Sequence, residues 1–373
     1  MSQQKQDQLS RVIIEGYKSI EECDVDLKNI NVLIGSNGAG KSNFVSAFTL
    51  LQSILREELS HYVGKKGGAH TLLYKGVVGA DSIKMSFAIN DYTFTFKLDV
   101  SDDNRLIIYH ESFVNRKGQT GYITAKPVGL DESEMMDSSR LFTDDTNVFF
   151  SKLKSSAWRV YHFHDTGPTS KMKQSHNISN AHMFFEDARN LAAFLYRLRT
   201  VYPPHYKNIL DAVKIVAPYF EDFVLEPEEL NHEYIFLRWQ QKGCEDIFNP
   251  SQLSDGTLRF ICLATLLLQP PELQPATIII DEPELGLHPF AITIFAEMVK
   301  SAAVNKQIIL STQSVELLNH FEADDVIVVD RSENGSKFKR LDSEKLKIWL
   351  DDYKLGELWN MNILGGRLSM CID

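Results

Sequence analysis

A glycine-rich segment near the start of the chain has the residue types and the spacing that bind phosphate groups. Residues 35–43 read GSNGAGKSN, so three glycines precede Lys41 and Ser42. Glycine adopts positive φ at little cost, which lets consecutive backbone N–H groups curl around an anion. Lys41 would place its charge between the β- and γ-phosphates of a nucleotide, and the Ser42 hydroxyl would bind Mg²⁺. The residues that we expect to contact the nucleotide in this loop are Asn37, Gly38, Gly40, Lys41, Ser42 and Asn43.

The residues on either side of this loop indicate a strand before it and a helix after it. Residues 30–34 are apolar apart from one asparagine, and residues 44–58 contain neither glycine nor proline. We therefore expect a strand, the loop and then a helix. The N-terminus of that helix would add its partial positive charge to the phosphate site. The spacing G-x-x-x-x-G-K-S in this context is a specific signal for nucleotide binding.

Two carboxylates farther along the chain supply groups that phosphoryl transfer also needs. Residues 277–280 (TIII) predict a buried parallel strand, and Asp281 and Glu282 follow at its carboxyl end. Open α/β sheets bind their ligands at that edge. Asp281 would hold Mg²⁺ through water, and Glu282 would polarise the attacking water. The alternative is an acidic strand end that only caps the next helix, and the apolar strand before it argues against that.

A third segment distinguishes one subclass of nucleotide-binding protein from the others. Residues 253–257 read LSDGT and stand at the start of an apolar helix expected over 258–268. They resemble LSGGQ, the signature motif of the ABC ATPases, with changes at two of the five positions. Ser254 would act as the helix N-cap and, with the Gly256 N–H, would present the helix N-terminus to a γ-phosphate. In that family the phosphate belongs to the other subunit, so the resemblance implies a head-to-tail homodimer with two ATP molecules at its interface.

Within the ABC class, three further stretches resemble the branch of soluble ATPases that includes SMC, RecF and OLD-like proteins. Residues 12–20 (VIIEGYKSI) are similar to its first strand, residues 281–289 (DEPELGLHP) to its acidic segment, and residues 308–314 (IILSTQS) to its switch strand. The resemblance assigns Glu282 and Gln313 as catalytic residues and ATP with Mg²⁺ as cofactors. Many relatives have histidine in place of Gln313. Glutamine can donate to a γ-phosphate oxygen but cannot transfer a proton, and a polar strand cap is the alternative for this residue.

The resemblance also implies the fold: an α/β P-loop NTPase of the ABC-ATPase head type, with a mixed sheet core, an antiparallel β subdomain and a helical lobe that carries the signature. We expect one head over residues 1–373. Its parts would be an N-terminal lobe at 10–115, an insertion with the helical lobe at 116–250, and the remaining motifs with a C-terminal tail at 251–373. No sustained heptad pattern runs through residues 60–250, so a long coiled coil is not expected.

Hydrophobic periodicity in the middle of the chain fits this division. Alternating apolar residues predict antiparallel strands at 83–87 and 92–98, joined by a turn at residues 90–91, and a third strand at 106–109. Residues 182–223 are predicted to be mainly helical, with a break at two consecutive prolines.

The composition of the chain limits the cellular compartment and the binding partners that we expect for it. The chain has 373 residues, 43% of them hydrophobic, which is enough for a large core. No apolar run approaches the roughly 20 residues that span a bilayer, and the four cysteines lack C-x-x-C pairing, so we expect a cytoplasmic protein without membrane contact. A formal net charge of −11 argues against tight nonspecific DNA binding, although basic clusters at 65–66, 171–173 and 337–340 leave local contacts open.

Three other features are less specific. Residues 161–165 (YHFHD) suit a strand end near the nucleotide better than a metal or nuclease site, because their spacing on a strand does not let three ligands converge. Glu284 and His288 follow the acidic strand and are open to either a coupling role at the dimer interface or ordinary helix capping. Residues 349–359, with two tryptophans, suggest docking of the tail onto its own core or onto a partner.

Two classes of function remain. In the first, the chain is the ATPase of a bacterial defence system, against phage or linked to a toxin or nuclease, and it senses or licenses a separately encoded effector protein. In the second, it is a DNA repair or recombination ATPase similar to RecF or SMC that clamps DNA when ATP joins two copies. A transporter subunit fits less well because of the divergent signature and the glutamine switch. A nucleotide sensor without turnover is disfavoured by Glu282. Hydrolysis is expected to be slow, because the signature must arrive from another molecule.

Overall fold

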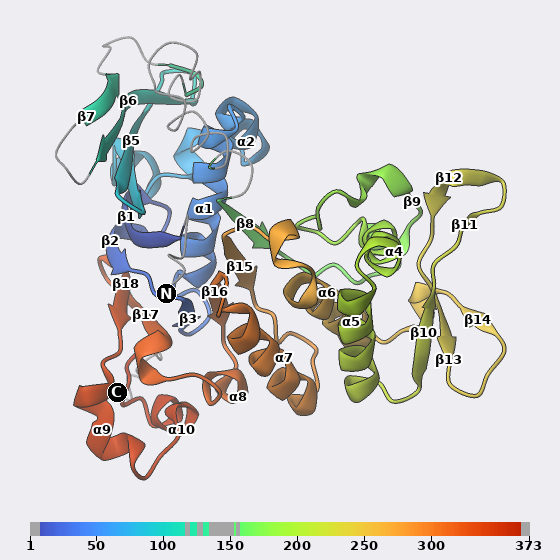
Figure 1. Cartoon of the computed structure of the whole chain (residues 1–373). Coiled ribbons are helices and arrows are strands. Elements are labelled where there is room, and N and C mark those ends of the chain that lie inside the picture. The colour runs from blue at the N-terminus through green and yellow to red at the C-terminus, as the bar shows by residue number, and fades with distance from the viewer. Residues whose placement is uncertain (1–7, 116–119, 125–129, 134–152, 154–156, 367–373) are drawn as a thin grey trace.

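The computed structural model describes residues 8–115, 120–124, 130–133, 153 and 157–366 (Figure 1). Two six-stranded sheets form the main body, and a helical lobe projects from it beside α6 (Asp255–Leu268). Among the helices that the structure describes, none is long and apolar enough to span a bilayer.

The central sheet is mixed, and all its neighbouring pairs are parallel except one antiparallel pair at its edge. In spatial order its strands are β18 (Gly335–Arg340), β17 (Val326–Ser332), β3 (Ile30–Ile34), β16 (Gln307–Thr312), β15 (Thr277–Asp281) and β8 (Trp158–Tyr161). Its inner strands are buried on both faces, so apolar residues run without a polar alternation. Alternate residues of these strands enter two different cores: Ile279 and Ile309 face one, whereas Ile280 and Ile308 face the other.

The second sheet is antiparallel and contains the strands predicted from alternating apolar residues. Its order is β2 (Ile20–Asp26), β1 (Leu9–Tyr17), β4 (Ser82–Ile89), β5 (Tyr92–Val100), β6 (Leu106–Asn115) and β7 (Thr120–Thr124). The predicted turn between β4 and β5 is confirmed, with Asn90 in the left-handed region at φ 53°. Phe87 stacks on Phe94 across the two strands with ring centroids 4.9 Å apart, and both rings are buried.

The helix that follows the glycine-rich loop lies between the two sheets. This helix, α1, spans Lys41–Leu55 and packs Phe44 and Phe48 into the core that both sheets share. It begins three residues earlier than predicted and ends three residues earlier, because the chain turns at Glu57, whose φ is 60°. The next helix, α2, spans Leu59–Lys65.

The lobe contains the predicted helices and also strands that the periodicity did not indicate. Its helices are α4 (Leu191–Val201) and α5 (Pro203–Val216), which meet at the predicted proline break, and α6 packs against α5. The prediction of mainly helical structure over 182–223 is wrong at both ends, since the first α-helix of this range begins only at Leu191 and Phe220–Val224 is strand β10. Phe220 stacks on Trp239 of β13 at an interplanar angle of 9°, and this cross-strand aromatic pair stabilises the strand.

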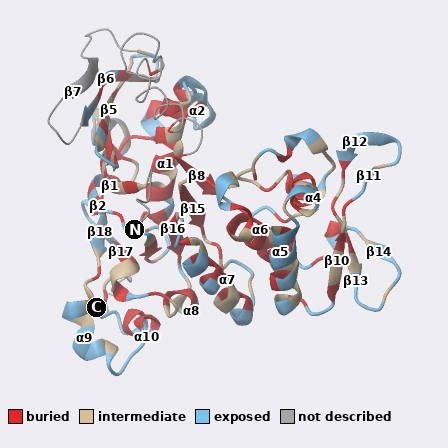
Figure 2. Ribbon diagram, in the orientation of Figure 1, coloured by how far each residue is buried: buried red, intermediate tan, exposed pale blue. Residues whose placement is uncertain are grey.

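The remaining strands of the lobe form two small antiparallel sheets. One contains β10 with β13 (Arg238–Gln241) and β14 (Ile247–Phe248), and the other contains β9 (His176–Asn177), β11 (Pro227–Glu228) and β12 (Asn231–Ile235). The last helices are α7 (Pro289–Ala302), α8 (Val315–Leu318), α9 (Ser343–Leu350) and α10 (Leu355–Asn360). Figure 2 shows that buried residues follow the central sheet and the adjoining faces of α1, α6 and α7.

A buried glutamine joins the two six-stranded sheets. Gln307 begins β16 and is 1% exposed. Its amide donates to the carbonyls of Leu9 (2.7 Å) and Lys28 (2.9 Å), and its Oε1 accepts from the Leu9 N–H and the Thr277 hydroxyl. Every polar atom of this side chain therefore has a partner, which a buried amide requires. The bonds to Leu9 connect the antiparallel sheet to the central sheet at the N-terminal end of β16.

Candidate functional site

The glycine-rich loop leaves β3 and enters α1 through backbone conformations that only glycine adopts easily. Gly38 has φ 75° and Gly40 has φ 117°. A Cβ at Gly40 would lie 2.0 Å from Ser336 Oγ, whereas a Cβ at Gly38 would meet nothing within 4 Å. Gly40 is thus required both by its φ and by the close approach of β18.

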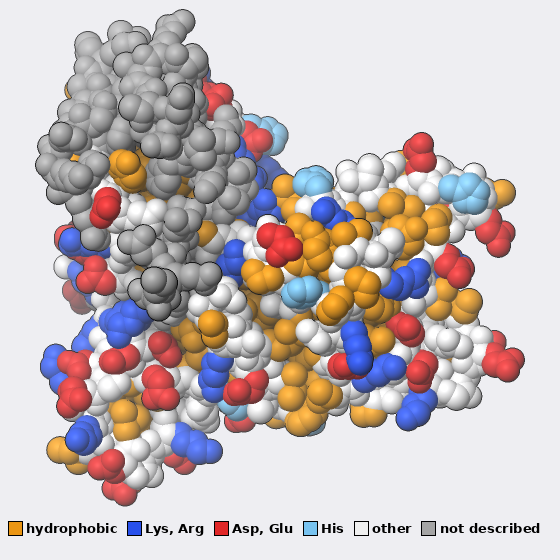
Figure 3. All heavy atoms as spheres, in the orientation of Figure 1, with side chains coloured by type: hydrophobic (Ala, Val, Ile, Leu, Met, Phe, Trp, Pro, Cys, Tyr) orange, Lys and Arg blue, Asp and Glu red, His pale blue; other side chains and the backbone are white. Residues whose placement is uncertain are grey.

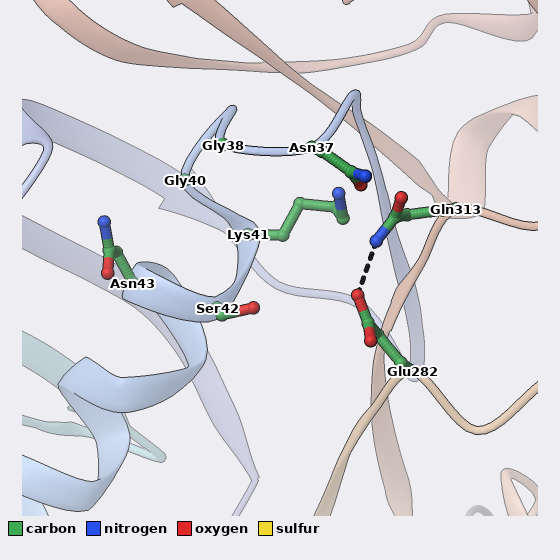
Figure 4. Close-up of a pocket in the computed structure, with 8 residues that line it drawn as sticks. All are labelled: Asn37, Gly38, Gly40, Lys41, Ser42, Asn43, Glu282 and Gln313. Carbon is green, nitrogen blue, oxygen red and sulfur yellow. Dashed lines mark hydrogen bonds between the residues drawn. The ribbon is translucent and has the colours of Figure 1, made fainter. Parts of the chain in front are cut away.

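This loop forms one wall of an open pocket of about 430 Å³ at the carboxyl edge of the central sheet. Eight residues line the pocket: Asn37, Gly38, Gly40, Lys41, Ser42, Asn43, Glu282 and Gln313 (Figure 4). All eight were predicted as site residues from the sequence. Three of the predicted residues, Asp281, Ser254 and Gly256, do not line it.

Lys41 lies in the wall of the pocket and is buried. Its Nζ donates to the carbonyls of Gly35 (2.7 Å) and Ser36 (3.1 Å) in its own loop. Burial lowers the pKa of Lys41, while the nearby carboxylates, Glu282 first, act in the opposite direction. The ammonium group is thus held beside acidic side chains with little water around it, where its attraction to an anion is least screened.

The two predicted carboxylates stand at the end of β15, but in different surroundings. Asp281 is buried, and its Oδ1 has no hydrogen-bond partner within the described part of the chain. The hydroxyl of Ser311, its paired neighbour on β16, also lacks a partner there. Buried polar atoms normally find partners, so this pair fits a site completed by a hydrated divalent cation. The exposed Ser42 hydroxyl is the other predicted ligand.

Glu282 is held in a strained conformation that turns its side chain toward the loop. Its φ is 47°, which is rare for a residue with a Cβ, and its N–H donates to the Ser311 carbonyl at 2.8 Å. Gln313 Nε2 donates to Glu282 Oε1, as Figure 4 shows. Residues that the surrounding structure holds in a rare backbone conformation are typical of functional sites.

Glu284 and His288 have separate structural roles. Glu284 Oε1 accepts the Gln313 N–H at 2.9 Å, and burial raises the pKa of this carboxyl group. Glu284 therefore connects the acidic segment to the end of β16 and orients the switch residue. His288 is the N-cap of α7, and its Nδ1 accepts the Phe290 N–H at 3.2 Å. Helix capping thus accounts for His288, and positioning of the switch accounts for Glu284.

The signature segment caps α6 as predicted but lies outside the pocket of its own chain. Ser254 is the N-cap, and its Oγ accepts the Thr257 N–H at 3.1 Å. Ser254 itself is exposed. A Cβ on Gly256 would lie 2.4 Å from the Gly286 carbonyl, so glycine lets this helix start pack directly against the loop after β15.

Sequence reasoning did not assign a role to Arg259, which connects three parts of the site. This buried side chain of α6 donates from Nε to the Phe163 carbonyl at 2.9 Å and from Nη2 to the His164 carbonyl at 3.2 Å. Its Nη1 donates to the Leu285 carbonyl. An arginine among the apolar residues of α6 was the available signal, because a buried guanidinium needs acceptors.

The histidines after β8 lie near the acidic strand end. β8 ends at Tyr161, and His164 Nε2 donates to the Asp281 carbonyl at 2.9 Å. Burial lowers the pKa of His162, which also interacts with the Asp281 charge. Within the described residues, no three metal-binding side chains form a cluster, so the segment does not assemble a metal site of that kind there.

A short polar network fixes the start of α1 against the first hairpin. Asn43 Nδ2 donates to Ser19 Oγ at 2.7 Å, and the Ser19 and Ser336 hydroxyls are 2.7 Å apart. Lys18 Nζ donates to the Ser46 hydroxyl at 2.9 Å, and burial lowers the pKa of Lys18 to about 8. The stretch GYKS, recognised in the sequence, thus forms the turn that supports the loop.

The sheet order, the loop and the helical lobe with its signature segment define the class: an ABC-type P-loop ATPase of the SMC/RecF branch. The chain belongs to the family described as "AAA domain, putative AbiEii toxin, Type IV TA system", whose family model matches residues 30–319. A 44-residue stretch is 48% identical to the DNA replication and repair protein RecF of Vibrio campbellii (strain ATCC BAA-1116). That match spans only 12% of either protein.

Solved structures of Smc heads have the same fold at low sequence identity. An SmcHead crystallised with the C-winged helix domain of ScpA is 16% identical and has a TM-score of 0.59, covering 91% of this chain and 99% of that one. An Smc head with an extended coiled coil, bound to the C-terminal domain of ScpA derived from Pyrococcus furiosus, is 14% identical with a TM-score of 0.56. It covers 92% of this chain and 99% of its own. These likenesses confirm the predicted head fold.

Replacing Arg259 with methionine should lower the stability of the lobe contact. The Arg259→Met side chain keeps much of the apolar stem but leaves three carbonyls without their donor. Losing hydrogen bonds of a buried group costs about 1–3 kcal/mol each in unmet desolvation, so the urea midpoint should fall clearly. The matched control is Arg331→Met at an exposed position of β17. Equal urea midpoints for the two variants would contradict the role assigned to Arg259.

Proposed function

We propose that the chain binds ATP with Mg²⁺ in the pocket at the carboxyl edge of the central sheet and hydrolyses it. One observation carries this proposal: the fold brings the loop lysine, Lys41, together with Glu282 and Gln313, which come from distant parts of the sequence. The family to which the chain belongs supports it as well.

The residues of the pocket divide into binding groups and reacting groups. The backbone N–H groups of residues 37–43 and the Lys41 ammonium would bind the phosphates. Ser42 and the unpartnered Oδ1 of Asp281 would hold Mg²⁺, through water on the Asp281 side. The cation neutralises charge on the β- and γ-phosphates when bound.

Glu282 is the group placed to activate water. Its carboxylate lies in the pocket wall and accepts a hydrogen bond from Gln313, so both side chains point at the same region (Figure 4). Glu282 would accept the proton of the attacking water, and Gln313 would donate to a γ-phosphate oxygen. An amide neither gains nor loses a proton near neutral pH, so proton transfer falls to Glu282 alone.

We infer that the site is completed by a second copy of the chain. The exposed N-terminus of α6, with Ser254 and Gly256, is not part of the pocket in its own chain. Ser254 caps the Thr257 N–H, and the other N–H groups of the first turn can bind an anion. A γ-phosphate held by the partner would be that anion. In this arrangement two ATP molecules join two chains head to tail, and turnover waits for the dimer.

For the biological role we propose an ATPase of a bacterial defence system that controls a separately encoded toxin or nuclease. The family description, which names a putative AbiEii toxin and a toxin–antitoxin system, supports this role. A DNA clamp is the second candidate, and the short match to RecF supports it. On the visible face in Figure 3, acidic and basic side chains are mixed over the described residues, and the net charge is −11. Extensive phosphate contacts need a basic surface, which favours the first role.

Lys41→Ala should abolish measurable ATP binding. Loss of the buried ammonium removes the main positive charge of the pocket, and an effect of about 100-fold or more on Kd corresponds to ~2.7 kcal/mol. The measurement is a titration with a fluorescent ATP analogue in the presence of Mg²⁺. Lys300→Ala, on the exposed side of α7, is the control. Unchanged affinity in a folded Lys41→Ala protein would refute the site.

Glu282→Gln should trap an ATP-bound dimer, because ATP still binds while the water is no longer activated. Light scattering should give a monomer mass without nucleotide and a dimer mass with ATP and Mg²⁺. Adding Ser254→Arg to this variant should abolish the dimer and leave ATP affinity unchanged, since Ser254 lies outside its own pocket. A dimer that forms without nucleotide, or loss of ATP binding on adding Ser254→Arg, would exclude the sandwich arrangement.

The biological role is tested by copurification from the native host. Tagged Glu282→Gln and Lys41→Ala chains would be isolated in parallel, and their bound protein and nucleic acid identified. We expect Glu282→Gln to retain a stoichiometric protein that the wild-type chain releases on ATP turnover. If Glu282→Gln retains DNA without a protein, and Lys41→Ala retains no DNA, the result would instead support the second role, an ATPase that clamps DNA.

A further inference from the structure

The C-terminal part of the chain folds back onto the core, and only one of its tryptophans takes part. Leu358 and Trp359 of α10 are buried, whereas Trp349 of α9 is 44% exposed and lies beside Tyr353. The tail therefore docks through α10 and the residues after it. We call residues 355–366 the C-terminal clamp.

One end of the clamp contacts the phosphate-binding loop. The Gly366 carbonyl accepts the Ser36 N–H at 3.1 Å. Gly366 fits tightly here: its φ is 81°, and a Cβ would lie 2.8 Å from the Trp359 ring and 2.8 Å from Val328 Cγ1. Val328 is paired with Ile34, the last residue of β3 before the loop. The carbonyl is thus held by packing against the same strand pair from which the loop departs.

The other end of the clamp contacts the helix that follows the switch. Gly356 of α10 donates its N–H to Asn319 Oδ1 at 2.8 Å, and a Cβ there would lie 2.5 Å from Val315 Cγ1. Val315 begins α8, whose N-cap is Ser314, the residue directly after Gln313. The clamp therefore joins the two segments that face each other across the pocket.

We propose that the C-terminal clamp positions the phosphate-binding loop and the switch, and so sets nucleotide affinity and turnover. This inference rests on the proposed ATP site. Holding the Ser36 N–H orders the first turn of the loop before a nucleotide arrives. Without that bond, binding must itself order the loop, which lowers affinity. At the switch end, displacement of α8 moves Gln313 relative to Glu282 and affects the hydrolytic step.

Two adjacent glycines provide a matched test. Gly365 and Gly366 both have φ 81°, but a Cβ on Gly365 would meet nothing within 4 Å. Gly365→Ala therefore introduces the backbone strain alone, and Gly366→Ala adds the clash that displaces the carbonyl. We expect Gly366→Ala to raise the Kd for ATP about tenfold relative to Gly365→Ala, within the usual range of coupling between neighbouring sites. Equal Kd values for the two variants would overturn the proposal.

The kinetic pattern separates positioning from general stability. Gly366→Ala should raise the Kd with kcat nearly unchanged, whereas Gly356→Ala should lower kcat with little effect on Kd. If Gly366→Ala and Gly356→Ala both weaken ATP binding and lower kcat to the same extent, and these losses follow the fall in the thermal unfolding midpoint, the role of the clamp is merely structural and the proposal is overturned. If Gly366→Ala does not fold, Trp359→Leu in the full-length chain removes the ring against which Gly366 packs, and an ATP affinity equal to that of Gly365→Ala would also overturn the proposal. Wild-type chain that fails to bind ATP would instead refute the site itself.

Discussion

The parallel pairing of β3, β16 and β15 is the constraint on which the site depends. Ile34 is paired with Thr312, and Ser311 is paired with Asp281. Because parallel strands end at one edge, the residues that follow these pairs emerge side by side. The glycine-rich loop, the acidic segment and the switch are therefore neighbours in space, although they are far apart in the sequence. The apolar strands that enforce this register are buried on both faces and cannot shift without exposing one core or the other.

At that edge, the fold places one lysine and three carboxyl groups in the same region. Glu282, Asp281 and Glu284 lie near enough to the Lys41 ammonium to oppose the lowering of its pKa by burial. Burial opposes the charged forms of both Lys41 and Glu284, and the strained backbone of Glu282 adds a local cost. A protein tolerates such free-energy costs where the rest of the fold is stable enough to hold these residues in place. Here the two sheets, joined by the fully bonded Gln307, supply that support.

Contacts from two distant segments connect parts of the site to the rest of the fold. Arg259 connects the signature helix to the segment after β8 and to the loop after β15, so one side chain links the lobe to the acidic segment. From the other side, Gly366 bonds the loop that contains Ser36. The acceptors of the Arg259 hydrogen bonds are backbone carbonyls. The donor to the Gly366 carbonyl is the backbone N–H of Ser36. Neither kind of contact depends on the partner's side-chain type.

Local patterns predicted the glycine-rich loop, the buried strand before Asp281 and the helix N-cap at Ser254, because each is a short run whose spacing reflects backbone geometry. The signature and switch assignments came instead from the resemblance to a known family. The strands around Phe87 and Phe94 were equally readable, since alternation with period two is a local property. In contrast, Phe220 stacks on Trp239, Arg259 bonds to Phe163, and Gly366 bonds to Ser36 only after distant segments meet. The same holds for Glu284, which follows β15 and whose carboxylate accepts the N–H of Gln313 at the end of β16. Such contacts carry no fixed spacing along the chain, so tertiary packing decides them and the order of residues does not.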